Sequence, residues 1–121
     1  VEVQAEKNQA LLERMIAMDD GAAYLGECAF VPTRSPINQS GLIFYNTLFD
    51  ENAACHLALG MGFDNCLREY DRYTKAEREA LGVNDSVIHV DFMIGCEDLE
   101  ITGETADGEQ VPIFREGNWA F

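Results

Sequence analysis

The sequence predicts an α+β fold, in which a mixed or antiparallel sheet is accompanied by two short helices. Two segments have helical spacing or capping, several apolar runs have the length and composition of strands, and one Asp-Gly pair marks a hairpin. The chain has 121 residues, of which 47% are hydrophobic. A chain of that size and composition can bury a core, so we expect residues 1–121 to form a single domain.

Both predicted helices have recognisable ends. Residues 7–18 place four apolar side chains at helical spacing, and Gly21 is expected to take the left-handed conformation that ends this helix. The second helix begins at Thr74-Lys75-Ala76-Glu77, which has the spacing of a capping box. It is expected to continue to Leu81, before Gly82 ends it.

Three apolar runs in the first half of the chain predict strands. Ala22–Val31 is apolar on both alternating faces except at Glu27, a pattern typical of a strand covered on two sides. Gly41–Leu48 is rich in aromatic and branched residues. Ala53–Met61 is compatible with a strand or a buried helix, because the period of a short apolar run does not separate the two. We interpret it as a strand.

The second half of the chain predicts a further strand and a hairpin. Ser86–Gly95 is the strand, and Leu99–Phe114 is expected to fold back at Ala106-Asp107-Gly108, since Asp-Gly is a strong hairpin signal. Pro112 has no backbone N–H, so we expect it to lie on an edge strand.

The net charge of −14 narrows the classes of partner. Surplus negative charge repels phosphate backbones and anionic lipids, which excludes nucleic acid and membrane surfaces and favours cations or amines. No apolar run approaches the ~18 residues of a spanning helix, and charged residues stand where a signal peptide would be apolar. We therefore expect a soluble protein that is not exported.

The cysteines and the first residue add two expectations. The four cysteines form no Cys-x-x-Cys pair and have apolar neighbours, which fits buried thiols in a reducing cytosol. The chain starts at Val1, and helix-like sequence follows almost at once. We expect it to be a piece of a longer chain.

The strand Ser86–Gly95 contains the clearest candidate for chemistry. His89 and Asp91 are two residues apart, so their side chains project from the same face of the strand. An ionised carboxylate beside an imidazole in an apolar strand costs several kcal/mol unless a cation or hydrogen bonds compensate.

Three further residues strengthen the indication of a metal site. Glu27 is a carboxylate within a strand, Glu51 follows an apolar run, and His56 is the only other histidine. The predicted strands contain no Lys or Arg that could pair with these groups. A divalent cation explains all of these features, and mixed nitrogen and oxygen ligands suit Zn, Co or Mn better than Ca.

Each candidate also has a simpler interpretation when it is taken alone. His89 and Asp91 could form an ordinary buried pair, Glu51 could be a solvated turn residue, and His56 could be a satisfied core histidine. A cysteine nucleophile is a further alternative, because Cys55 and His56 are neighbours. Adjacent strand residues face opposite ways, however, so His56 could not serve Cys55 as a base.

Five blocks of sequence carry a more specific signal: Leu25–Ala29, Asn38–Gly41, Phe44–Ala53, Cys55–Gly60 and His89–Gly95. In this order they closely resemble the C-terminal part of the thermophilic-type (M29) metalloaminopeptidases. The tail from Val111 to Ala120 extends the resemblance over nearly the whole chain. Members of that family are cytoplasmic enzymes that use two metals to remove N-terminal residues from peptides.

The resemblance implies a role for each candidate ligand. Glu27 matches the carboxylate between the two metals and is the implied catalytic residue. Glu51, His56, His89 and Asp91 match other metal-ligand positions. The family draws a further glutamate ligand from a segment upstream of this sequence, so these residues alone would not complete the site.

One position departs from the family pattern. The family has a tyrosine seven positions after the histidine that matches His56, and this sequence has Phe63 there, without a hydroxyl. Either Tyr70 or Tyr73 substitutes from the following loop, or that role is absent here.

The resemblance also implies a function for the whole protein. It implies that residues 1–121 are the metal-binding, C-terminal catalytic-domain fragment of a larger two-domain aminopeptidase, and we expect the fragment alone to be inactive. The implied cofactors are two divalent metal ions (Zn, Co, Mn or Mg), and the implied partners are peptides with a free N-terminus. We expect a cytoplasmic homodimer. The alternative is a non-catalytic, metal-stabilised dimerisation module.

Overall fold

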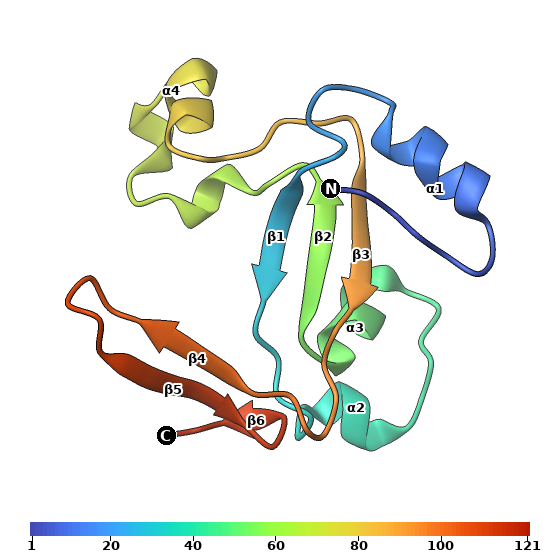
Figure 1. The fold of residues 1–121 in the computed structure, drawn as a ribbon, viewed down its shortest axis with the longest axis vertical. Helices are drawn as coiled ribbons and strands as arrows, with labels where there is room; N and C mark the ends of the chain where they lie inside the picture. Colours follow the sequence, from blue (N-terminus) through green and yellow to red (C-terminus); the bar gives the residue numbers. More distant parts are fainter. The chain divides into compact units, whose positions relative to one another are not determined.

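The structure is a computed structural model that describes residues 1–121, and the chain divides into two compact units. The first unit comprises Val1–Cys28 and Leu57–Phe92, and the second comprises Ala29–His56 and Met93–Phe121. The elements confirm the α+β class, with sheets and a few short helices (Figure 1). There are four α-helices where the sequence predicted two. None is long and apolar enough to cross a membrane.

The two predicted helices are present in the first unit. Helix α1 spans Gln9–Ile16 and α4 spans Lys75–Ala80. The capping box of Thr74 and Glu77 is confirmed, and Gly82 has the positive φ of 101° that ends a helix. The role predicted for Gly21 is wrong, because α1 ends at Ile16 with Ala17 as its C-cap, and Gly21 has no positive φ.

A close approach of two chain segments explains why a glycine stands at position 21. A Cβ built on Gly21 would lie 1.8 Å from the carbonyl oxygen of Asp85. Since no real Cβ comes so near another heavy atom, only glycine fits there. Gly21 therefore lets the segment after α1 pack against the segment around Asp85, which leads to the strand His89–Met93.

One sheet has the strand order β1-β2-β3, with β1 at Leu25–Ala29, β2 at His56–Gly60 and β3 at His89–Met93. The arrows of adjacent strands point in opposite directions in Figure 1. The strand interpretation of Ala53–Met61 is confirmed, since β2 lies within it. The strands are shorter than predicted, and Leu25 at the start of β1 is exposed. The two-sided cover predicted for Ala22–Val31 is therefore incomplete in these 121 residues.

The predicted strand Gly41–Leu48 is wrong. Helix α2 spans Pro36–Ser40 and α3 spans Thr47–Asp50, with no strand between them. Local hydrogen bonds explain the difference, because Asn46 caps α3 through the N–H of Leu48. The Asp50 carboxylate also accepts hydrogen bonds from the N–H groups of Phe44 and Asn46, which folds this segment back on itself.

Three single-turn 3₁₀-helices complete the helical elements, at Glu51–Ala53, Asp64–Cys66 and Tyr70–Arg72. The first belongs to the second unit and follows α3 directly. The other two lie in the first unit, between β2 and α4.

The second sheet lies in the second unit and has the order β4-β5-β6. The strands span Ile101–Glu104, Gln110–Arg115 and Asn118–Trp119, and both pairings are antiparallel. The predicted hairpin is confirmed, with Gly108 at a φ of 81°.

The edge position predicted for Pro112 is wrong, because β5 is the central strand. Pro112 pairs with Thr102 on β4, whereas β6 pairs only with Phe114 and Arg115. Pro112 thus lies beyond the end of β6, where its missing N–H breaks no β6 hydrogen bond.

Aromatic side chains form the core of the second unit. Phe114 is fully buried, and its ring lies 4.5 Å from that of Trp119 and 6.0 Å from that of Phe30, centroid to centroid. These tilted pairs are typical of aromatic cores and attach the hairpin to the segment after β1.

Candidate metal centre

Three of the predicted site residues meet in the first unit. Glu27 lies on β1, and His89 and Asp91 lie on β3, two residues apart as a shared face requires. One ligand atom from each of the three lies within 4.8 Å of the others. Strand β2 separates β1 from β3, and its alternate residues Ala58 and Gly60 are small. Glu27 and His89, from the two outer strands, come within 3.3 Å of each other.

The imidazole of His89 is at the centre of this group. Its Nε2 lies 3.3 Å from Oε2 of Glu27 and 3.3 Å from Oδ1 of Asp91. All three side chains are between 20% and 23% exposed, so water reaches the group only in part. The Oδ1 atom of Asp91 is buried and makes no hydrogen bond, although it lies at ion-pair distance from Nε2. Nε2 of His89 and Oδ1 of Asp91 are therefore close to each other but do not form a hydrogen bond.

A backbone carbonyl determines which ring nitrogen of His89 is available. Nδ1 lies 2.7 Å from the carbonyl oxygen of Met61, and it must carry a proton to donate to that oxygen. In the neutral ring, Nε2 then has a lone pair that faces both carboxylates. Histidine ligands of metals typically donate their other N–H to a carbonyl in this way.

The distances in the group fit a cation among the three side chains. Metal-bound nitrogen and carboxylate oxygen atoms lie about 2.0–2.2 Å from Zn²⁺, so neighbouring ligands of a tetrahedral site are about 3.3–3.6 Å apart. The two separations of 3.3 Å match that spacing. A bound cation would also interact with Oδ1 of Asp91, which is otherwise a buried oxygen without a hydrogen bond. The residues present therefore fit a divalent metal ion.

The other two predicted ligands belong to the second unit. Glu51 begins the 3₁₀ turn Glu51–Ala53 and is partly buried. His56 is only 2% exposed, and its Nδ1 lies 3.0 Å from the carbonyl oxygen of Ala54. This is the arrangement of His89 repeated, with Nδ1 directed to a carbonyl and Nε2 as the possible ligand atom. That Glu51 and His56 belong to the same centre as His89 stays a prediction.

Phe63 lies beside the candidate centre. Its ring centroid is 5.0 Å from that of His89, with a tilt of 57°. Phe63 can fix the orientation of the imidazole, but it offers no hydroxyl. The guanidinium of Arg78 lies 5.7 Å from the ring centroid of Tyr70, and its Nε donates to the carbonyl of Tyr73. Arg78 belongs to α4, so these contacts attach the loop that contains Tyr70 and Tyr73 to that helix.

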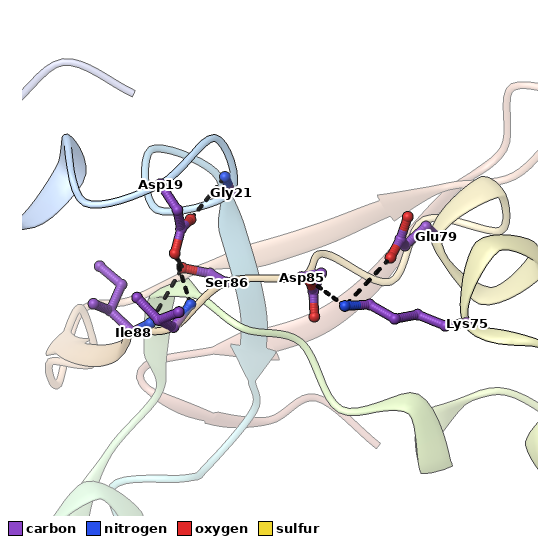
Figure 2. A network of polar contacts seen from close by, with 8 residues as sticks. Asp19, Gly21, Lys75, Glu79, Asp85, Ser86 and Ile88 are labelled. Atoms are coloured by element: carbon purple, nitrogen blue, oxygen red, sulfur yellow. Dashed lines mark hydrogen bonds and ion pairs between the residues drawn. The ribbon is translucent and has the colours of Figure 1, made fainter.

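Sequence reasoning missed the network that holds the start of β3. The Asp19 carboxylate accepts hydrogen bonds from the N–H groups of Gly21 and Val87 and from the hydroxyl of Ser86, at 2.7–3.1 Å (Figure 2). The Ser86 hydroxyl oxygen in turn accepts from the N–H of Ile88, next to His89. These contacts lower the pKa of Asp19, and the hydrogen bond from the Val87 N–H has the largest effect. In the sequence, Asp19 resembled no more than a residue at a helix end.

Asn84 adds a second connection near the centre. Its Nδ2 donates to the carbonyl oxygens of Gly21 at 2.8 Å and Gly60 at 2.6 Å. The segments before β1 and β3 and the end of β2 are thereby joined through one side chain. On the other side of Figure 2, Lys75 pairs with Asp85 at 2.6 Å, and this contact raises the pKa of Lys75.

Comparisons with known proteins agree with a metal centre. The family model described as thermophilic metalloprotease (M29) matches residues 1–119. The chain is 54% identical over 121 residues to Aminopeptidase 2 of Geobacillus stearothermophilus and 50% identical over 121 residues to Aminopeptidase AmpS of Bacillus subtilis (strain 168). All of this chain is covered in both alignments, but only 29% and 30% of those proteins.

A solved structure is similar over the same length. Wild-type AmpT from Thermus thermophilus matches 100% of this chain and 29% of its own chain, with a TM-score of 0.84 and 43% identity. The chain thus spans less than a third of the length of these relatives, and it corresponds to a fragment of a larger enzyme.

Proposed function

Because this chain belongs to the thermophilic metalloprotease (M29) family, we propose that the whole protein is a metal-dependent aminopeptidase. It would hydrolyse the first peptide bond of peptides with a free N-terminus, and residues 1–121 would supply most of its metal ligands. The convergence of Glu27, His89 and Asp91 carries this proposal. Relatives that match 98–100% of the chain and are named aminopeptidases support it.

Two divalent ions, from among Zn, Co, Mn and Mg, are proposed as the cofactors. His89 and Asp91 would hold one ion, and Glu27 would lie between the two. Glu51 and His56 are proposed as further ligands on their residue type, and for His56 on its Nδ1 contact with a carbonyl. A glutamate from an upstream segment would complete the set.

The chemistry of the site follows from its donor set. When bound, divalent ions act as Lewis acids and lower the pKa of water from 15.7 to roughly 7. Glu27 would accept the proton of the attacking water, which requires its carboxylate to be ionised. The Met61 carbonyl keeps the proton of His89 on Nδ1, and the Asp19 network keeps the start of β3 in place. The negative charge of the chain favours the cationic N-terminus of a peptide.

The non-catalytic dimerisation module is not favoured, since the named relatives are aminopeptidases. A cytoplasmic location and a homodimeric assembly stay predictions of this proposal.

Glu27→Gln in the full-length protein tests the proposed function. We expect the wild type to hydrolyse leucine p-nitroanilide when supplied with cobalt or zinc, and to lose activity with a chelator. The Gln variant should fold but lose more than a hundredfold in kcat, because a neutral amide cannot accept the water proton. Glu2→Gln, at an exposed position outside the candidate centre, is the control. Turnover by the Gln variant within tenfold of wild type would contradict the role of Glu27.

A further inference from the structure

A pocket of about 430 Å³ in the first unit adjoins the candidate metal centre. Glu27 forms part of its wall, and so does Phe63, whose ring packs on the imidazole of His89. The pocket therefore adjoins one residue of the candidate centre, Glu27. A volume of this order is within the range of sites for small molecules, and it is ample for one amino-acid side chain.

The remaining wall of the pocket is apolar. It includes Leu67, Leu81, Val83 and the thiol-bearing Cys66, and Glu27 is its only charged residue. Leu81 is 54% exposed and Phe63 is 48% exposed, so these two lining residues retain large apolar surfaces that a ligand could cover. Burying such apolar surface stabilises a complex.

A neighbouring pocket of about 340 Å³ has a different character. It contains Lys75 and Arg78, but Lys75 pairs with Asp85 and Arg78 with Asp64. Its cations are thus already paired within the protein. A charged substrate group would have to displace these contacts in the neighbouring pocket. An apolar side chain can enter the pocket beside Glu27 without breaking an ion pair.

We propose that the pocket of Phe63, Cys66, Leu67, Leu81 and Val83 receives the side chain of the substrate's N-terminal residue, and that it selects apolar side chains. This inference rests on the proposed aminopeptidase activity. The N-terminal residue is assigned because its α-carbon lies one bond from the scissile carbonyl, which must be near Glu27. A side chain on that carbon is then the substrate group nearest to the pocket wall.

Cys66→Trp in the full-length enzyme tests the proposal by filling the pocket from an exposed position. Asn65→Trp is the matched control, since Asn65 is exposed on the same 3₁₀ turn but does not line the pocket. The value of kcat/KM is measured for glycyl, alanyl, leucyl and phenylalanyl p-nitroanilides with the wild type and with each variant. We expect Cys66→Trp to lower kcat/KM for the leucyl and phenylalanyl substrates at least tenfold, and to leave the glycyl substrate within twofold. Asn65→Trp should alter none of these values more than twofold.

A second variant, Leu81→Ala, removes part of the wall. Leu81 is 54% exposed, so we expect this variant to fold. It should lower kcat/KM for the leucyl substrate about fivefold relative to the alanyl substrate, as expected for lost apolar contact.

The same panel separates failure of this inference from failure of the proposed function. Equal losses for all four substrates with Cys66→Trp, or no loss for any, would overturn the pocket assignment while wild-type turnover upholds the aminopeptidase. A dipeptide series that varies only the second residue should respond to Cys66→Trp by less than twofold. A larger, side-chain-dependent response there would assign the pocket to the other side of the scissile bond. Wild type without metal-dependent activity on any substrate would overturn the proposed function itself.

Discussion

The Asp19 carboxylate accepts a 2.7 Å hydrogen bond from the backbone N–H of Val87, two residues before the proposed ligand His89. Asp19 precedes β1, which carries Glu27, and Val87 precedes β3, which carries His89 and Asp91. One carboxylate therefore joins the two segments that enter the strands of the candidate centre. The contact predicts an effect of Asp19 on stability.

Asp19→Asn is expected to destabilise the protein in a pH-dependent way. The pKa of Asp19 is lowered by its contacts, the Val87 N–H above all, so its stabilising effect is present above the ordinary aspartate pKa of about 4. That effect is lost as pH falls through the lower pKa of the folded state. We expect Tm at pH 7 to fall by about 2–5 °C and the difference from wild type to shrink toward pH 3. Thermal unfolding followed by circular dichroism measures it.

Asp20→Asn is the control for this experiment, because Asp20 is the exposed neighbouring carboxylate. It should change Tm by less than 1 °C at either pH. A difference between Asp19→Asn and wild type that grows toward pH 3 would contradict the hydrogen-bonded role of Asp19.

His89→Ala is expected to weaken metal binding. The Nε2 atom of His89 is the nitrogen ligand of the three-residue group, and Ala leaves that group with only the carboxylates of Glu27 and Asp91. We expect the affinity of the full-length protein for cobalt or zinc to fall at least tenfold, with Tm of the metal-free protein changed by only a few degrees. Isothermal titration calorimetry measures the affinity. Equal affinity in variant and wild type would remove His89 from the centre.

Phe63→Tyr is expected to raise kcat. Phe63 stands where the resemblance to the M29 family implies a tyrosine, and its ring centroid lies 5.0 Å from that of His89, so Tyr would place a hydroxyl next to the centre. A hydrogen-bond donor at a developing oxyanion is worth about a hundredfold in rate, and we expect a gain of about tenfold or more with KM nearly unchanged. Tyr70→Phe and Tyr73→Phe should each leave kcat within twofold. A large loss in either one would show that its hydroxyl substitutes for the missing group.

Local signals in the sequence predicted local structure well. Thr74 and Glu77 specify the start of α4 because both capping partners lie within one turn. Gly41–Leu48 was misinterpreted, since its aromatic and branched composition favours a strand while the side chains of Asn46 and Asp50 satisfy its N–H groups in another way. Short-range hydrogen bonds can thus override the intrinsic preference of a segment.

The candidate centre was predictable in its residues but not in its support. Glu27, His89 and Asp91 attracted attention because each is a polar group in an apolar strand, a conflict visible without a structure. Asp19 gave no such signal, since its hydrogen-bond donors at Ser86 and Val87 lie 67 and 68 positions away. Contacts of this range depend on how strands are arranged, and no periodicity in the sequence encodes them.

The isolated 121 residues are expected to fold but not to catalyse. Glu27, His89 and Asp91 can hold one ion, whereas the second is expected to need a carboxylate from an upstream segment. Two-metal hydrolysis needs both ions to orient the water and to stabilise the oxyanion, so loss of one should cost a thousandfold or more in rate. We predict no detectable hydrolysis of leucine p-nitroanilide at saturating cobalt or zinc, together with a cooperative unfolding transition by circular dichroism. The full-length protein, assayed in parallel, is the positive control. Chelator-sensitive turnover by the purified fragment, abolished by Glu27→Gln, would mean that these residues alone complete the centre.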